Sequence, residues 1–96
     1  MSVRNAVENA ENLPNGARVY LFGSACYRQH PRDIDLLFVY DDRILPPEEA
    51  YGSFRPMSEY VGDQVGIHVH PTVLSVSEFE ASNFLEKVEP VELRMA

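Results

Sequence analysis

The residues best suited to chemistry lie together in the segment VYLFGSACYRQHPRDIDLLFVYD. An apolar run ends at Gly23-Ser24, and after an eight-residue loop a second apolar run opens with Asp33 and Asp35. Side chains alternate along a strand, so we expect the two aspartates to project from one face, about 7 Å apart at the backbone. Carboxylates that close repel each other unless a cation lies between them. The spacing therefore predicts a cation site.

Mg²⁺ is the expected cation, because it prefers oxygen ligands and commonly binds through one or two carboxylates plus substrate phosphates. A carboxylate pair can also bridge two metal ions about 3.5–4 Å apart. Gly23 lets the backbone approach a ligand closely, and the Ser24 hydroxyl with nearby N–H groups suits phosphate oxygens. A lone D-x-D triplet is common and most often solvated. The combination of strand, Gly-Ser, short loop and D-x-D indicates function.

Charge is distributed unevenly along the chain. Fifteen acidic residues against eight basic ones give a net charge of −7, which disfavours nucleic acid or an anionic membrane surface as a partner. By contrast, residues 24–32 hold Arg28, His30 and Arg32 and no acid. Guanidinium groups pair well with phosphate oxygens, so this loop suits a small anion. The alternatives are that both arginines are simply solvated or that Arg32 shields the aspartates.

The composition indicates one globular domain spanning residues 1–96. The longest apolar run, residues 36–40, is far short of the roughly 20 residues that a membrane helix needs. The N-terminal residues lack the apolar core of a signal peptide. Cys26 is the only cysteine, so no internal disulfide forms and a cytoplasmic location is expected.

Hydrophobic periodicity and turn residues predict a small α/β (α+β) domain, in which a three- to four-stranded mixed sheet is packed by helices. The expected elements are a helix over 3–13, strands over 17–22 and 33–40, a helix start at 46–49 followed by broken helix or loop to 62, a strand over 64–74, and a C-terminal helix after 75. Ser75 and Glu78 form the pattern of a capping box at the start of that last helix.

The segment from residue 19 to 41 resembles the signature of the DNA polymerase β-type nucleotidyltransferase superfamily, and in particular its minimal nucleotidyltransferases. The resemblance implies the nucleotidyltransferase fold, with Gly23 and Ser24 contacting a nucleoside triphosphate and Asp33 and Asp35 holding Mg²⁺. It places Arg28 and Arg32 in the loop that covers the triphosphate. It also implies attack of a hydroxyl on the α-phosphorus with pyrophosphate as the leaving group. The terminal stretch FLEKVEPVEL matches the family's last helix loosely.

One departure from the family pattern concerns the third strand, where these enzymes usually carry a third carboxylate. Alignment on residues 73–75 places His70 at that position, and no acid occurs between residues 64 and 77. A neutral imidazole can act as a general base near neutral pH, although it is a poorer Mg²⁺ ligand than a carboxylate. The nearest alternative acid is Asp63, which precedes the strand.

Three interpretations of His68 and His70 remain open at this point. Both are sheet residues without chemistry, or His70 replaces the missing carboxylate, or the two histidines join Cys26 and His30 in a Zn²⁺ site. The first two need only that both histidines share one face, as the period of a strand requires. The third needs four distant side chains to converge.

The sequence thus predicts a Mg²⁺-dependent nucleotidyltransferase that moves a nucleoside monophosphate, AMP from ATP, to a hydroxyl of a protein or small molecule. A rival hypothesis is a catalytically impaired relative that acts by binding a partner, as an antitoxin does. A third is a nucleotide-sensing subunit of a larger transferase. The partners that the resemblance implies are the nucleotide, a HEPN-type ribonuclease toxin or another protein, and a second copy of the chain.

Overall fold

The computed structural model describes residues 2–11 and 13–95, and over these residues the chain forms an α+β domain with one four-stranded mixed sheet and four α-helices. The order along the chain is α1 (Val3–Asn9), β1 (Arg18–Phe22), the 3₁₀ turn η1 (Gly23–Cys26), β2 (Asp33–Tyr40), α2 (Pro47–Val65), β3 (His68–Ser75), α3 (Val76–Ala81), α4 (Phe84–Val88) and β4 (Val91–Met95). The predicted fold class is confirmed at this level.

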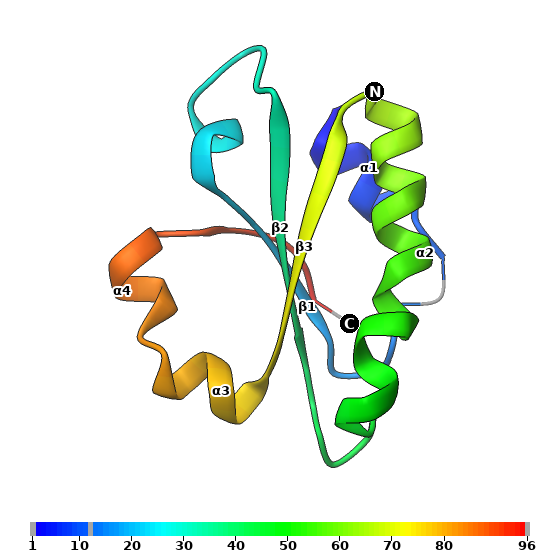
Figure 1. The fold of residues 1–96 in the computed structure, drawn as a ribbon, viewed down its shortest axis with the longest axis vertical. Helices are drawn as coiled ribbons and strands as arrows, with labels where there is room; N and C mark the ends of the chain where they lie inside the picture. Colours follow the sequence, from blue (N-terminus) through cyan, green and yellow to red (C-terminus); the bar gives the residue numbers. More distant parts are fainter. Residues whose placement is uncertain (1, 12, 96) are drawn as a thin grey trace.

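The strands lie in the order β3-β2-β1-β4, so β2 and β1 are central and the other two are edges. Strand β1 pairs antiparallel with both β2 and β4, whereas β2 and β3 are parallel and are joined by the crossover helix α2. Figure 1 shows α1 and α2 on one side of the sheet and α3 and α4 on the other. The sheet is therefore the middle of three layers.

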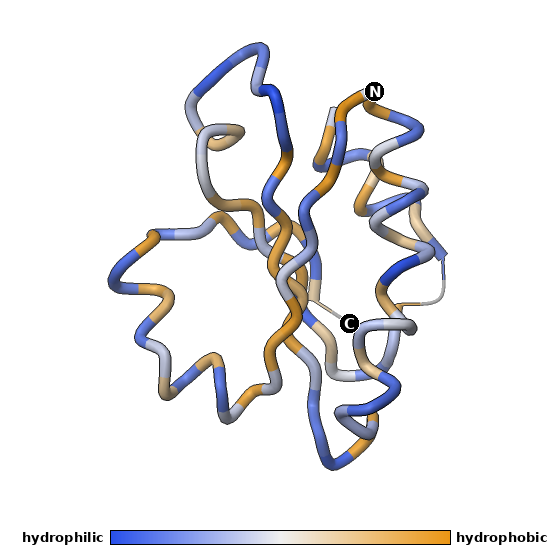
Figure 2. Tube along the Cα trace, in the orientation of Figure 1, coloured by the Kyte–Doolittle hydropathy of each residue, from blue (hydrophilic) through white to orange (hydrophobic). Residues whose placement is uncertain are grey.

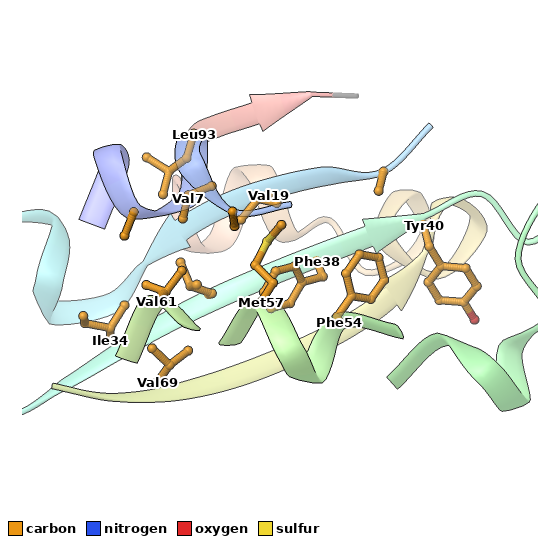
Figure 3. Packing of buried hydrophobic residues seen from close by; sticks show 14 of the residues in the cluster. Val7, Val19, Ile34, Phe38, Tyr40, Phe54, Met57, Val61, Val69 and Leu93 are labelled. Carbon is orange, nitrogen blue, oxygen red and sulfur yellow. The ribbon is translucent and has the colours of Figure 1, made fainter. Parts of the chain in front are cut away.

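Strand β2 contributes to two cores at once. Ile34, Leu36 and Phe38 pack with α1 and α2 in the larger core, where the Phe38 and Phe54 rings stack with centroids 4.8 Å apart (Figure 3). Leu37 and Val39 point to the opposite face and pack with Phe79 and other aromatic residues of the smaller core. The hydropathy colouring shows the same pattern, with apolar residues along the middle of the sheet and polar ones in the loops (Figure 2).

Helix α2 corrects one expectation, since residues 50–62 form continuous helix and not broken helix or loop. Pro56 lies inside the helix, where proline costs about 3 kcal/mol. The helix nevertheless buries Phe54, Met57 and Val61 against the sheet. Each such side chain contributes about 1.5–3 kcal/mol on burial, so their sum outweighs the proline.

The C-terminal region corrects a second expectation. A helix begins after Ser75 with the predicted capping box, but it ends at Ala81, and α4 follows a left-handed Asn83 at φ +55°. Pro90 then prevents the helix from continuing, and the last residues form strand β4 along the free edge of β1. The terminal helix suggested by the family resemblance is therefore absent from residues 91–95.

A β-bulge in β4 turns Arg94 toward α1. The register of β4 against β1 shifts between Val19 and Tyr20, so Leu93 and Arg94 both face the side of the sheet that α1 and α2 cover. Nη1 of Arg94 donates to the carbonyl oxygens of Val7 at 3.0 Å and Ala10 at 2.6 Å. Val7 lies in the last turn of α1 and Ala10 is its C-terminal cap, where carbonyl groups run out of helical partners. The Val7 carbonyl also accepts from the N–H of Ala10 at 3.3 Å.

The remaining boundaries differ little from the expected ones. Strand β2 covers the predicted residues, β1 begins one residue later, and α1 ends at Asn9 rather than at 13. Strand β3 starts at His68, because the residues before it complete α2 and a left-handed Gly66 ends that helix at φ +78°. Within the described part of the chain, no helix has the length and apolar character to cross a membrane.

Alanine substitution of Gly52, inside α2, and of Gly66, the residue that caps its C-terminal end, should have opposite effects on stability. An added Cβ meets nothing within 4 Å at Gly52 or at Gly66, so only the backbone distinguishes them. We expect Gly52→Ala to raise the free energy of unfolding by about 0.5–1 kcal/mol and Gly66→Ala to lower it by about 1 kcal/mol, since only Gly66 is left-handed. Urea denaturation measures both, and changes of the same sign would contradict the assignment of the helix end.

Removing the Arg94 guanidinium takes a charged donor away from the carbonyl oxygens of Val7 and Ala10. We expect Arg94→Met to lower the free energy of unfolding by about 1.5–3 kcal/mol, the usual range for hydrogen bonds to charged groups. Arg4→Met is the matched control, because Arg4 is exposed on α1 and no ion pair is recorded for it among the described residues. Denaturation curves in which the two variants lose equal stability would refute this role of Arg94.

Candidate functional site

The two aspartates of the D-x-D pattern lie on the part of the sheet that α3 and α4 leave uncovered. Asp33 and Asp35 share a face of β2 with Leu37 and Val39, which the smaller core covers. Asp33 is exposed and Asp35 is partly buried. The same strand is thus apolar where helices cover it and acidic where they do not.

The parallel pairing of β2 with β3 brings His70 to the aspartates. Asp35 pairs with His70 in the register, and Asp33 pairs with His68. Nε2 of His70 lies 3.3 Å from Oδ1 of Asp33, and both side chains are about half exposed. His70 therefore lies next to the two carboxylates, as the sequence alignment predicted. The His68 ring meets that of His70 edge to face, with centroids 4.6 Å apart.

Gly23 has a left-handed backbone that favours glycine, and the Asp35 carboxylate occupies the space beside it. Strand β1 ends at Phe22, which pairs with Asp35, and Gly23 follows at φ +76°. A Cβ at Gly23 would overlap Oδ2 of the Asp35 carboxylate. The sequence pattern predicted that the Gly23 backbone lies close to a ligand. In the structure it lies close to the carboxylate of Asp35, a contact that the sequence pattern alone does not reveal.

Six of the seven predicted site residues line one open depression of about 480 Å³ beneath the η1 loop, and Gly23 adjoins it. The six are Ser24, Arg28, Arg32, Asp33, Asp35 and His70. Among the described residues, neither arginine has an ion-pair partner within 4 Å. A guanidinium with no carboxylate partner keeps its donors available for an anion.

The donor set of the depression suits Mg²⁺ in the presence of phosphate. Two carboxylates on one face, with a glycine in place of a side chain beside them, match a hard cation that takes most of its other ligands from water or phosphate. Over residues 2–11 and 13–95, no group of three or more His, Cys, Asp or Glu side chains is arranged to hold a metal ion. The carboxylate pair thus offers two protein ligands, and a metal ion bound there would take its remaining ligands from water or a bound anion.

The zinc interpretation finds no support in the arrangement of its four residues. Cys26 lies in η1 and its thiol donates to the carbonyl of Leu21 at 3.3 Å. Burial raises the pKa of the Cys26 thiol, which disfavours the thiolate that zinc requires. His30 is exposed in the loop, whereas His68 lines a different hollow, along α2.

That second hollow is a groove of about 910 Å³ between α2 and β3, here called the α2–β3 groove. Its lining includes Arg55, Glu59 and Asp63 from α2 and His68 and His70 from β3. Asp63, the alternative third carboxylate, belongs to this groove and does not line the depression with Asp33 and Asp35. Arg55 and Glu59 form an ion pair at the i, i+4 spacing of a helix. This spacing is a sequence signal for helix, and it was missed because residues 50–62 were expected to form broken helix or loop.

Substitution of Gly23 tests its contact with Asp35. We expect Gly23→Ala to displace the Asp35 carboxylate, because the new methyl group takes its place. Gly16→Ala is the matched control: its φ of +78° gives the same backbone strain, but its nearest neighbours lie at 3.5 Å. Both variants should lose about 1–2 kcal/mol from the left-handed backbone. Only Gly23→Ala should shift the ¹³C carboxyl resonance of Asp35, and an unshifted resonance would rule the contact out.

Comparison of the chain with protein-family models, with curated proteins and with solved structures finds no match. The resemblance to the nucleotidyltransferases therefore rests on the sequence pattern of residues 19–41. The geometry of the depression supplies the independent argument about function.

Proposed function

We propose that this protein binds a nucleoside triphosphate with Mg²⁺ in the depression and transfers its nucleoside monophosphate to a hydroxyl group. The observation that carries the proposal is the convergence of carboxylates, guanidinium groups, a hydroxyl and an imidazole on one hollow. In a chain of net charge −7, a hollow with two arginines that have no ion-pair partner among residues 2–11 and 13–95 is well suited to an anion.

Each side chain has a role that its chemistry and place support. Asp33 and Asp35 hold the metal, which neutralises charge on the phosphates. Arg28 and Arg32 pair with phosphate oxygens, and the Ser24 hydroxyl donates to another. Transfer of the nucleoside monophosphate needs no covalent intermediate on the protein. Positioning of the reactants and electrostatic stabilisation of the phosphates suffice.

The transfer forms one bond and breaks another at the α-phosphorus. The acceptor oxygen bonds to that phosphorus, and the bond from it to the oxygen shared with the β-phosphate breaks, releasing pyrophosphate. The hydroxyl proton passes to the imidazole of His70 and from there to water.

The replacement of a third carboxylate by His70 favours a second candidate function. An imidazole next to the metal-binding pair neutralises Asp33 when protonated, which weakens metal binding and slows transfer. In this alternative the protein acts as a binding module that controls a partner by contact, as an antitoxin does. Control of the partner that survives Asp35→Asn would favour the binding module over the enzyme.

Calorimetric titration with ATP tests the proposal without knowledge of the acceptor. We expect ATP to bind the wild type only when Mg²⁺ is present, and the double variant Asp33→Asn, Asp35→Asn to lose that binding by a factor of at least ten. The loss follows because carboxamides do not neutralise the cation that links the phosphates to β2.

The control for this titration is the double variant Asp42→Asn, Glu48→Gln, which removes two exposed carboxylates outside both the depression and the α2–β3 groove. It should bind Mg²⁺-ATP as the wild type does. Folded wild-type protein that shows no Mg²⁺-dependent binding would overturn the proposal, as would equal losses in the two double variants.

A further inference from the structure

Gly62 and Gly66 line the α2–β3 groove toward the C-terminal end of α2. At Gly62 the helix backbone approaches Ile67, the residue before β3, so closely that a Cβ would lie 3.2 Å from its carbonyl oxygen. Gly66 then ends the helix, with no atom within 4 Å of an added Cβ. Figure 1 shows α2 alongside β3, with the end of the helix near the start of the strand. The groove thus opens at the same end of the sheet as the depression.

One residue joins the two hollows. His70 lines both the depression and the groove, and among the described residues it is the only one that does. Beside it, His68 lines the groove and its ring contacts that of His70. A molecule in the groove therefore lies against the same imidazole that lines the depression.

The charge of the groove contrasts with that of the depression. Arg55 is held by Glu59, with Nε 3.0 Å from Oε1, so this pair contributes no net charge. Asp63 has no ion-pair partner among the described residues. It lies near the C-terminal end of α2, where the helix dipole is negative and the last turn contains no basic residue. Both features favour a cation in the groove and disfavour a phosphate.

We infer that the α2–β3 groove binds the acceptor, and that this acceptor is a small hydroxyl compound carrying a protonated amine. The inference rests on the proposed function, which requires a hydroxyl beside His70. The ammonium lies against Asp63 and the end of α2, and the hydroxyl reaches His70. The volume of the groove is within the range of small-molecule sites, about 300–1,000 Å³. Phosphorylated acceptors and nucleic-acid ends are excluded by the same charges.

The test uses four small probes of similar shape and no nucleotide. Serinol (2-amino-1,3-propanediol) carries an ammonium and two hydroxyls, glycerol lacks the charge, glycerol 3-phosphate reverses it, and isopropylammonium lacks the hydroxyls. Titrations of ¹⁵N-labelled protein followed by NMR report which backbone amides each probe shifts. We expect serinol to shift the amides of Gly62, Asp63 and Gly66 and the ring resonances of His70. Isopropylammonium should shift the three amides but leave His70 unchanged.

Variants of Asp63 identify the source of selectivity. Asp63→Asn should weaken serinol binding about threefold to fivefold, as expected for an exposed ion pair, and Asp63→Lys should abolish it. Asp42→Asn is the matched control, an exposed aspartate just past the end of β2 and outside the groove. It should bind serinol as the wild type does.

The inference is overturned if serinol leaves the groove amides unshifted, if glycerol or glycerol 3-phosphate shifts them equally, or if binding survives Asp63→Lys. None of these outcomes depends on ATP. If the probes behave as expected but Mg²⁺-ATP does not bind in calorimetry, the proposed transfer fails while the groove remains a site for an amino alcohol.

Discussion

Strand β2 is buried on both faces over its last five residues, and this constraint places every other element. A strand with two apolar faces needs a layer on each side, so α1 and α2 cover one face and α3 and α4 the other. The first three residues of the strand extend beyond the smaller core. There the alternation of side chains resumes, with Ile34 in the larger core and Asp33 and Asp35 on the open face. The candidate site is the uncovered part of an otherwise buried strand.

The neighbours of β2 complete this site through backbone geometry alone. Antiparallel pairing ends β1 opposite Asp35, which leaves a left-handed glycine against the carboxylate, and parallel pairing sets His70 beside it. No side-chain hydrogen bond is recorded among the described residues that line the depression, although His70 and Asp33 lie in ion-pair range. Strand register therefore determines which groups meet, and loop residues supply the charge that faces them.

Much of this arrangement is predictable from the sequence, because period-two patterns and turn residues are local signals. The extent of β2, the shared face of His68 and His70 and the capping box at Ser75 are of this kind. Two predictions were wrong because tertiary packing, and not a local signal, determines the structure of those segments. Pro56 argues locally against a helix, yet the buried face of α2 outweighs it. Val91–Met95 is too short to indicate a strand until the free edge of β1 is known.

The bulged strand β4 has a consequence for the nascent chain. Its partners, β1 and the end of α1, lie seventy or more residues earlier, so both wait for at least that length of chain to be synthesised before they meet their last neighbour. Until residues 91–95 leave the ribosome, one edge of β1 offers unpaired N–H and C=O groups to any other extended chain. Contacts so distant in sequence also slow the final closure of the sheet. The five residues of β4 thus cover an aggregation-prone edge long after that edge has been synthesised.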